Sequence, residues 1–241
     1  MDKIEFLEEP TRSRSAVVAS FDLSGFSKFC SRPGGHDCIN KYLSNLFKFF
    51  DGVFGDDWRK KVETKVEAIR VPRPGFVKFT GDGALLMWLR DSQSDFTVEF
   101  CTSLVAALRH FQTSLPAEVE KWERVWRVTG LPKSARIGVA VGSVCPLMRA
   151  SEIWGISETV DYVGYCINLA VRLQDHCPQV SFLAHGPLHP HLEDVLLVPA
   201  VKIKGSVDEP VYLFRDEYVL VTGSLPAKEL RKEFDIGISE G

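Results

Sequence analysis

The sequence predicts an α+β sandwich in which helices cover a largely antiparallel sheet. Stretches of strand character are interspersed with stretches whose apolar residues recur at helical spacing. Two short apolar runs are joined by Gly81-Asp82-Gly83, a pattern that predicts an antiparallel hairpin with Asp82 at its tip. The 241 residues contain no internal repeat and no low-complexity linker, which favours one domain over two. A purely parallel sheet does not fit the hairpin connections.

The first half of the chain predicts three strands and a helix. Ser15–Leu23 is rich in valine and alanine and predicts a buried strand that ends in an acidic residue. Apolar residues form one stripe over about Asp37–Phe50, which predicts a helix. Asp57–Arg70 is charged and mixed, and predicts a helix or a long insertion that ends at a proline pair. The hairpin strands follow at Phe76–Thr80 and Ala84–Leu89.

The second half predicts two further helices and four short strands. Asp95–Leu115 has apolar residues at helical spacing and follows Ser94, a suitable helix N-cap. Ala135–Val144 predicts a strand, followed by a loop to about Thr159. The remaining predicted elements are a helix at Tyr165–Asp175 and strands near Val180–Leu183, Leu196–Lys204 and Val211–Phe214.

Composition excludes several classes of protein. The chain is 45% hydrophobic and 25% charged, with a net charge of −3, so it does not coat nucleic acid or bind anionic membranes through overall charge. Its longest uninterrupted apolar run, Ala84–Leu89, is far too short for a membrane span, and residues 1–14 are too charged for a signal peptide. We therefore expect a cytoplasmic protein with no membrane span and with its six cysteines reduced.

Two carboxylates stand where strands end. Asp22 closes the first predicted strand and Asp82 lies at the hairpin tip. Taken singly, each could be an ordinary turn residue. Carboxylates at adjacent strand ends can also share Mg²⁺ or Mn²⁺, whose remaining ligands come from water and substrate phosphates. Gly25 follows Asp22 closely and allows backbone N–H groups to approach an anion in front of a helix.

A second polar pair lies on the predicted helix Tyr165–Asp175. Asn168 and Arg172 are four residues apart and therefore project from one helix face. An amide and a guanidinium on one face can contact a ribose and a phosphate together, although a solvated polar face is the simpler interpretation. Arg136, within the strand Ala135–Val144, is expected to anchor the sheet, and support of the site through a neighbouring residue is the alternative.

Four motifs together resemble the class III nucleotidyl cyclases, and they occur in the order found in that family. They are Phe21-Asp22-Leu23-Ser24-Gly25-Phe26, Lys78-Phe79-Thr80-Gly81-Asp82-Gly83, Arg136-Ile137-Gly138-Val139-Ala140-Val141-Gly142, and Asp161-Tyr162-Val163-Gly164 followed by Asn168 and Arg172. The resemblance implies the class III cyclase fold, a ferredoxin-like βαββαβ core with extra C-terminal strands. It divides the chain into an N-terminal lead-in (1–13), a catalytic domain (14–216) and a C-terminal tail (217–241).

The resemblance also implies a reaction and residue roles. A nucleoside triphosphate would become a 3′,5′-cyclic nucleotide and pyrophosphate, with two divalent cations per site, Mg²⁺ or Mn²⁺. Asp22, Asp82 and the backbone of Leu23 would hold the cations, while Ser24, Gly25 and Phe26 would bind phosphate. Asn168 would orient the ribose, and Arg172 would stabilise charge on the α-phosphate. In this family the two halves of a site come from different subunits, so a head-to-tail homodimer is expected.

Lys78 and Asp161 match the positions that read the base. This pair occurs in adenylate cyclases, whereas guanylate cyclases usually carry glutamate and a small residue there. A lysine donor and an aspartate acceptor suit adenine, cytosine and uracil, and suit guanine poorly. The aromatic segment with Phe47, Phe49, Phe50, Phe54 and Trp58 could narrow a base pocket to a single ring. The alternative is that these residues form the helix core, which is the role expected of Phe47 and Phe50.

The hairpin sequence favours one subgroup of the family. Lys78 to Trp88 is similar to the stand-alone pyrimidine cyclases of bacterial antiphage defence, which favours UTP to cUMP or CTP to cCMP. A separate cyclic-nucleotide-binding effector would then read the product. An adenylate cyclase that makes cAMP is the alternative, and a catalytically degenerate nucleotide-binding dimerisation module is a further one.

Overall fold

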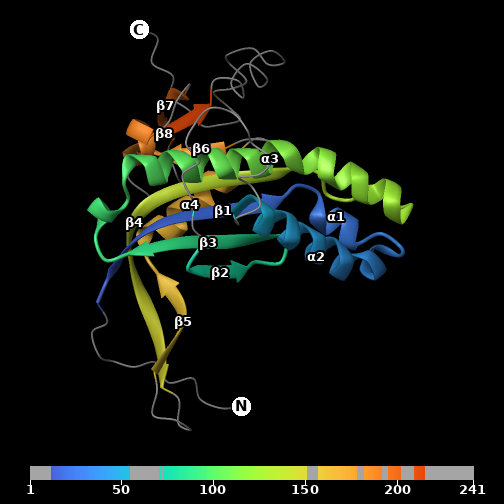
Figure 1. The fold of residues 1–241 in the computed structure, drawn as a ribbon, viewed down its shortest axis with the longest axis horizontal. Helices are drawn as coiled ribbons and strands as arrows, with labels where there is room; N and C mark the ends of the chain where they lie inside the picture. The colour runs from blue at the N-terminus through green and yellow to red at the C-terminus, as the bar shows by residue number, and fades with distance from the viewer. Residues whose placement is uncertain are drawn as a thin grey trace.

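The computed structural model describes residues 12–54, 71, 73–150, 157–177, 182–191, 195–201 and 209–214. Figure 1 shows the arrangement of its helices and strands. In chain order they are β1 (Arg14–Leu23), α1 (Phe26–Cys30), α2 (Gly35–Phe54), β2 (Phe76–Phe79), β3 (Gly83–Arg90), η2 (Gln93–Asp95), α3 (Val98–Trp126), β4 (Ala135–Ala150), β5 (Ser157–Val163), α4 (Tyr165–His176), β6 (Phe182–His185), η3 (Gly186–His191), β7 (Val195–Val201) and β8 (Glu209–Phe214).

One sheet organises the fold, with strand order β2-β3-β1-β4-β6-β8-β7, and β5 pairs separately with β4. β1 is antiparallel to β3 and to β4, and β2 is antiparallel to β3. Together with the helices between them, these four strands form the expected ferredoxin-like βαββαβ core. β6 joins parallel to β4, and β8 and β7 extend the sheet with antiparallel pairs. The predicted α+β sandwich with extra C-terminal strands is confirmed.

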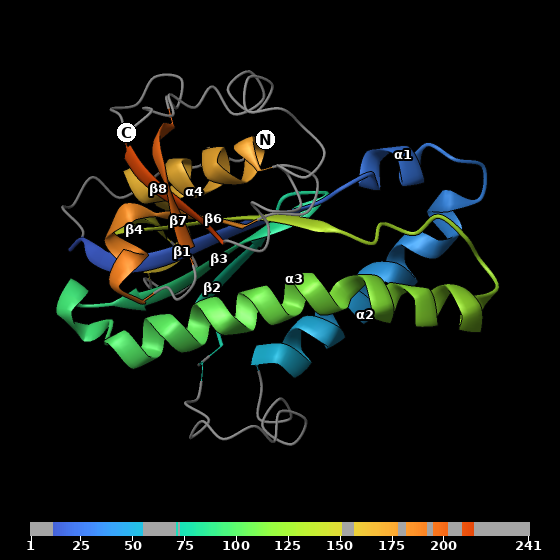
Figure 2. The ribbon, with the colours of Figure 1, turned by 90° about the horizontal axis from the view of Figure 1, so that it is seen from above.

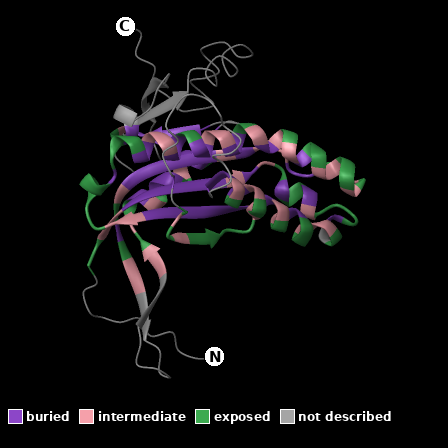
Figure 3. Cartoon of the chain, in the orientation of Figure 1, coloured by how far each residue is buried: buried purple, intermediate pink, exposed green. Residues whose placement is uncertain are grey.

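Helices cover both faces of this sheet. α2 and α3 lie on one face and α4 lies on the other (Figure 2). Each face has its own core, because successive residues of a strand point to opposite faces. Along β1, Val17, Ala19 and Phe21 pack under α2 and α3, whereas Ala16 and Val18 pack under α4. The central strands are accordingly buried on both faces (Figure 3).

α3 is longer than the sequence predicted. It continues past Leu115 and through Pro116 to Trp126. A proline commonly ends a helix, which is why the prediction stopped there. The residues after it are rich in strong helix formers, and buried Val119 continues the apolar stripe that packs on the core. Tertiary packing therefore outweighs the cost of Pro116.

The sequence predicted a loop where β4 and β5 form a long antiparallel hairpin. β4 extends to Ala150, and β5 pairs with it across a register shift between Leu147 and Met148. The hairpin projects away from the sheet in Figure 1. Because β5 is polar at its start and, within the described part of the chain, pairs only with β4, it lacks the apolar pattern that predicts a buried strand.

The other predicted elements were found, with shifted ends. The C-terminal strands appear as β6, β7 and β8, and the short helix α1 was not predicted. All six cysteines are free thiols, as expected. Within the described part of the chain, no helix has the length and apolar character needed to cross a membrane. The predicted element Asp57–Arg70, most of the lead-in (1–11) and the tail (217–241) lie outside the described residues.

Candidate active site

The predicted site residues of the sheet share the face covered by α4. Gly138 and Gly142 of β4 lie against α4, so Arg136, two residues before Gly138, points to the same face. Asp22 is paired with Arg136 across β1 and β4, and cross-strand partners share a face. Lys78 is opposite Leu85, whose side chain lies in the core under α4. The sheet thus places the chemical groups of three motifs on one side.

Asp22 and Asp82 lie together at the junction of β1 and β3. The Leu23 amide donates to the Asp82 carbonyl at 2.7 Å, and Asp22 is paired with Gly83. Burial raises the pKa of Asp22, and the neighbouring Asp82 raises it further, while Arg136 partly offsets both. A bound cation would stabilise the ionised form of a carboxylate, here Asp22, whose ionisation is opposed by burial and by a neighbouring carboxylate.

Gly83 is required for this close approach of the two aspartates. A Cβ atom on Gly83 would stand 1.8 Å from the Phe21 carbonyl oxygen. The Gly81-Asp82-Gly83 pattern predicted a turn, because glycine adopts turn conformations readily. Of these three residues only Gly81 has a positive φ, 104°, whereas Gly83 allows the close contact between strands.

The donor set fits a divalent cation bound with its substrate. Among the described residues, no group of three or more His, Cys, Asp or Glu side chains is placed to hold a metal ion. A site of two carboxylates and a backbone carbonyl would leave the remaining positions to phosphate oxygens and water, which is the usual coordination of Mg²⁺. Asp22, Asp82 and the Leu23 carbonyl are the groups that would hold it.

Arg136 contacts a partner that the sequence did not identify. Its guanidinium forms an ion pair with Asp22, donating to Oδ2 from both Nε, at 3.2 Å, and Nη2. Arg136 thus touches a predicted metal ligand, which favours the alternative that it supports the site over a role in the sheet alone. Only the pairing of β1 with β4 places the two residues opposite each other, and their 114-residue separation in the sequence gives no hint of it.

The turn after β1 was predicted to bind phosphate through Ser24, Gly25 and Phe26. The Ser24 amide donates instead to the Ser134 carbonyl at 2.9 Å, so it is already engaged within the fold. Among the backbone amides of this turn, those of Gly25 and Phe26 remain the predicted phosphate donors, and phosphate binding by the three residues stays a prediction. Gly25 has a positive φ of 82°, the left-handed conformation that glycine adopts readily, and α1 begins immediately after it.

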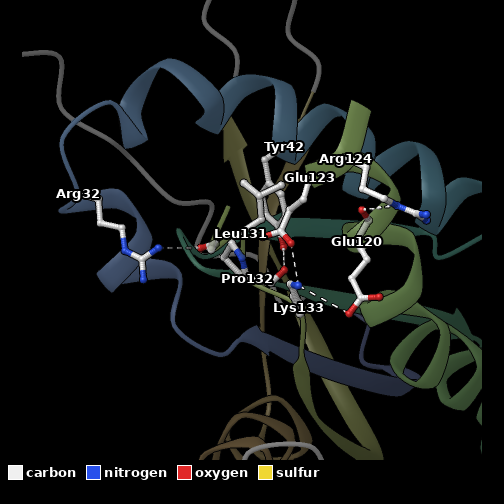
Figure 4. Close-up of polar contacts among 9 residues, drawn as sticks. Arg32, Tyr42, Glu120, Glu123, Arg124, Leu131, Pro132 and Lys133 are labelled. Carbon is white, nitrogen blue, oxygen red and sulfur yellow. Dashed lines mark hydrogen bonds and ion pairs between the residues drawn. The ribbon is translucent and has the colours of Figure 1, made fainter. Parts of the chain in front are cut away.

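The loop that contains Ser134 is held by a polar network at the end of α3 (Figure 4). Glu123 accepts a hydrogen bond from the Leu131 amide at 2.9 Å and pairs with Lys133 at 2.7 Å. The buried Tyr42 hydroxyl donates to the Pro132 carbonyl at 2.9 Å. Burial alone would raise the pKa of Glu123, but Lys133 and the loop amides outweigh it and lower that pKa. The network fixes the loop whose last carbonyl holds the turn after Asp22.

Lys78 and Asp161 meet although they are 83 residues apart. The Lys78 ammonium donates to Asp161 Oδ2, and the Tyr162 amide donates to Oδ1 at 2.9 Å. Next to this pair, the rings of Phe76 and Tyr162 pack edge to face at 5.1 Å. The structure therefore brings together the two residues predicted to read a base, with β2 supplying the donor and β5 the acceptor.

α4 carries Asn168 and Arg172 on the side that faces away from the sheet. Its inward side is formed by the buried residues Cys166, Leu169, Ala170 and Leu173. Asn168 is exposed and Arg172 is half-buried. The helix can pack closely on β4 because Gly138 has no side chain. A Cβ atom at this position would stand 2.2 Å from the Ala170 carbonyl oxygen. Within one chain, the Asn168 and Arg172 side is therefore turned away from the sheet surface that holds Asp22.

The aromatic residues of α2 pack against other parts of the fold. Phe50 and Phe54 are buried in the core under α2 and α3, and Phe49 stacks on Phe111. Phe47 packs against Phe79, whose side chain points to the face opposite that of Lys78. The contacts of the four phenylalanines favour the alternative that they pack in the helix core, as expected for Phe47 and Phe50, and Trp58 lies outside the described residues.

The structure is similar to solved class III cyclase domains. The adenylyl cyclase CyaB from P. aeruginosa matches with a TM-score of 0.59 and 17% identity, over 85% of this chain and 95% of that one. The guanylyl cyclase Cya2 matches with a TM-score of 0.57 and 18% identity, over 85% and 93%. The guanylate cyclase domain of RhGC from Catenaria anguillulae, in complex with GTP, matches at 0.57 and 15%, over 83% and 95%. No family model and no curated protein matches the sequence. The fold is thus the class III nucleotidyl cyclase fold.

Proposed function

We propose that this chain is a nucleotidyl cyclase that converts a nucleoside triphosphate into a 3′,5′-cyclic nucleotide and pyrophosphate. One observation carries the proposal: the two predicted metal ligands lie side by side in the fold, and the two residues predicted to read the base touch each other. Asp22 lies beside Asp82, and Lys78 touches Asp161, although members of each pair are far apart in the sequence. The class III cyclase fold, in which similar domains are adenylyl and guanylyl cyclases, supports the same reaction class.

The proposed reaction forms a bond between the ribose 3′-oxygen and the α-phosphorus. It breaks the bond between the α-phosphorus and the oxygen that bridges the α- and β-phosphates. Pyrophosphate leaves, and the 3′-hydroxyl proton passes to solvent. Two divalent cations, Mg²⁺ or Mn²⁺, would supply activation of the hydroxyl and neutralisation of the triphosphate. Asn168 would orient the ribose, and the Arg172 guanidinium would stabilise charge that develops on the α-phosphate oxygens.

We propose further that each site is shared between two copies of the chain in a head-to-tail homodimer. Asp22 lies on the sheet surface, whereas Asn168 and Arg172 lie on the outward side of α4. Groups that face different directions in one chain can converge across a two-fold interface. One copy would supply the two aspartates, and its partner would supply Asn168 and Arg172.

For the base we propose a pyrimidine, in the conversion of UTP to cUMP or of CTP to cCMP. The Lys78 donor and the Asp161 acceptor are already adjacent, an arrangement that complements uracil, cytosine or adenine and disfavours guanine. The pyrimidine preference rests on the likeness of Lys78 to Trp88 to the pyrimidine cyclases of antiphage defence. In that role a separate effector would bind the cyclic product. An adenylate cyclase is the competing assignment, because the same pair also suits adenine.

A product assay tests the proposal. The purified chain is incubated with Mn²⁺ and, separately, with ATP, GTP, CTP and UTP, and cyclic nucleotide and pyrophosphate are quantified. We expect a cyclic pyrimidine nucleotide and equimolar pyrophosphate, and no product from Asp82→Asn. Asp91→Asn is the matched control, since Asp91 lies beside Arg14 at the other end of β1. Absence of product from all four triphosphates would refute the cyclase assignment, and cAMP as the main product would refute the pyrimidine preference.

A further inference from the structure

The Asp22 carboxylate already has a cation, which belongs to the chain itself. The Arg136 guanidinium places Nε and Nη2 on a single oxygen, Oδ2. The contact is set by backbone pairing, because Asp22 and Arg136 are direct partners in the register of β1 and β4. The Asp22 side chain is 14% exposed and that of Arg136 is 30% exposed, so water screens the pair only in part.

We propose that Arg136 is an internal counter-ion that competes with a divalent cation for Asp22 and so weakens metal binding by the free protein. The inference rests on the proposed function, because it takes Asp22 as a metal ligand. A cation that reaches Oδ2 must displace the guanidinium or share the oxygen with it, and like charges at such short range repel. The guanidinium meanwhile offsets the mutual repulsion between the Asp22 and Asp82 carboxylates.

A purely structural arginine predicts the opposite sign of effect. If Arg136 served only to tie β1 to β4, its removal would loosen the position of Asp22 and weaken metal binding. If Arg136 competes with the metal, its removal takes the guanidinium away from Asp22 Oδ2, and metal binding by Asp22 and Asp82 becomes tighter. The direction of the change therefore separates the two roles.

The test measures Mn²⁺ affinity of the full chain without nucleotide, from the electron paramagnetic resonance signal of free Mn²⁺. We expect Arg136→Gln to bind Mn²⁺ roughly three- to tenfold more tightly than the wild type, because the competing charge is gone. Arg136→Lys keeps the charge but loses the two-nitrogen contact, so its affinity should fall between them. Arg14→Gln removes the same charge near the opposite end of β1 and should leave the affinity unchanged.

Three outcomes are decisive. Equal or weaker Mn²⁺ binding by Arg136→Gln, with a thermal melt like that of the wild type, would overturn the inference. If that variant does not fold, Arg136→Lys decides, because binding no tighter than that of the wild type contradicts competition. Asp82→Asn separates the two levels of the account. Unchanged Mn²⁺ binding in Asp82→Asn would refute the metal site and with it the proposed function, whereas weakened binding there with no gain in Arg136→Gln refutes the competition alone.

Discussion

Asp22 has a different neighbour on each side of β1. On the β3 side it is paired with Gly83, which brings Asp82 close, and on the β4 side it is paired with Arg136. Burial of Asp22 itself raises its pKa most, Arg136 adds positive charge that lowers it, and Asp82 adds negative charge that raises it further. The pKa of Asp22 is raised as the net result, so a bound cation would stabilise the ionised form of this carboxylate.

Arg172 is the residue whose loss should affect the chemical step most directly. We expect Arg172→Ala to lower kcat by about 10²- to 10³-fold with a small change in KM, because its guanidinium would contact charge that develops only in the transition state. Steady-state kinetics with the preferred triphosphate and Mn²⁺ measure the split. Arg172→Lys should recover little, since an ammonium lacks the planar fork of the guanidinium.

A control on the same helix limits the interpretation of that result. Asp175 is exposed on α4, one turn from Arg172 on the outward side. Asp175→Asn should leave kcat within about twofold of the wild type, since the change removes a screened surface charge. A similar loss of kcat in both variants would mean that α4 responds to any change on this side, and would contradict a specific role for Arg172.

At the scale of elements, the sequence predicts what repeats locally and misses what depends on distant partners. The strand at Ser15–Leu23 and the hairpin were correct because their apolar patterns are local. β5 was missed because, among the described strands, it pairs only with β4. α3 was cut short at Pro116 because burial of Val119 is a tertiary effect.

The site follows the same rule. The motif order identified Asp22, Asp82, Lys78 and Asp161, and the structure brings the members of each pair together. The contact of Arg136 with Asp22 required the β1 and β4 register, and the engagement of the Ser24 amide required the loop before β4. Neither feature has a periodic trace in the sequence.

The packing of α4 on β4 should be sensitive to one methyl group. We expect Gly138→Ala to lower the free energy of unfolding by about 2–4 kcal/mol, because its Cβ would clash with backbone of α4 at Ala170 and Gln174. Gly52→Ala is the matched control, since nothing lies within 4 Å of its Cβ in α2 and alanine favours a helix by about 0.5–1 kcal/mol. Urea unfolding of both variants measures the difference, and equal effects would contradict the close packing.

The network at the end of α3 should make stability depend on pH. The pKa of Glu123 is lowered in the folded state, so its contribution is present above its unfolded pKa and is lost as pH falls through the folded pKa. We expect Glu123→Gln to cost about 1 kcal/mol at pH 7, from the weakened Lys133 pair and loop contacts, and almost nothing near pH 3.

Urea unfolding across this pH range measures the effect. Glu118→Gln offers a control on the same helix. Among the described residues Glu118 forms an ion pair with the neighbouring Lys121, and it is not in the loop network. The control should change stability by less than about 0.5 kcal/mol at either pH. A pH-independent loss in Glu123→Gln would show that the carboxylate charge does not hold the loop.

On the scale of the whole molecule, the predicted site residues lie on two surfaces that face different directions within one chain. The surface around Asp22 and Asp82 belongs to the sheet, whereas Asn168 and Arg172 belong to the outer side of α4. A net charge of −3 gives a polyphosphate no general attraction, so its binding depends on local groups. A dimer with two shared sites would supply those groups from both copies.

Mixing two inactive variants tests this central claim most directly. Asp82→Asn should lack a metal ligand in every site, and Arg172→Ala should lack the guanidinium that stabilises the transition state. If subunits exchange freely, equal amounts should regain about a quarter of the wild-type cyclase activity, because half of the dimers are mixed and each has one intact site. Recovery near that level, with each variant alone inactive, is the result we predict. No recovery despite demonstrated formation of mixed dimers would contradict sites shared between two copies.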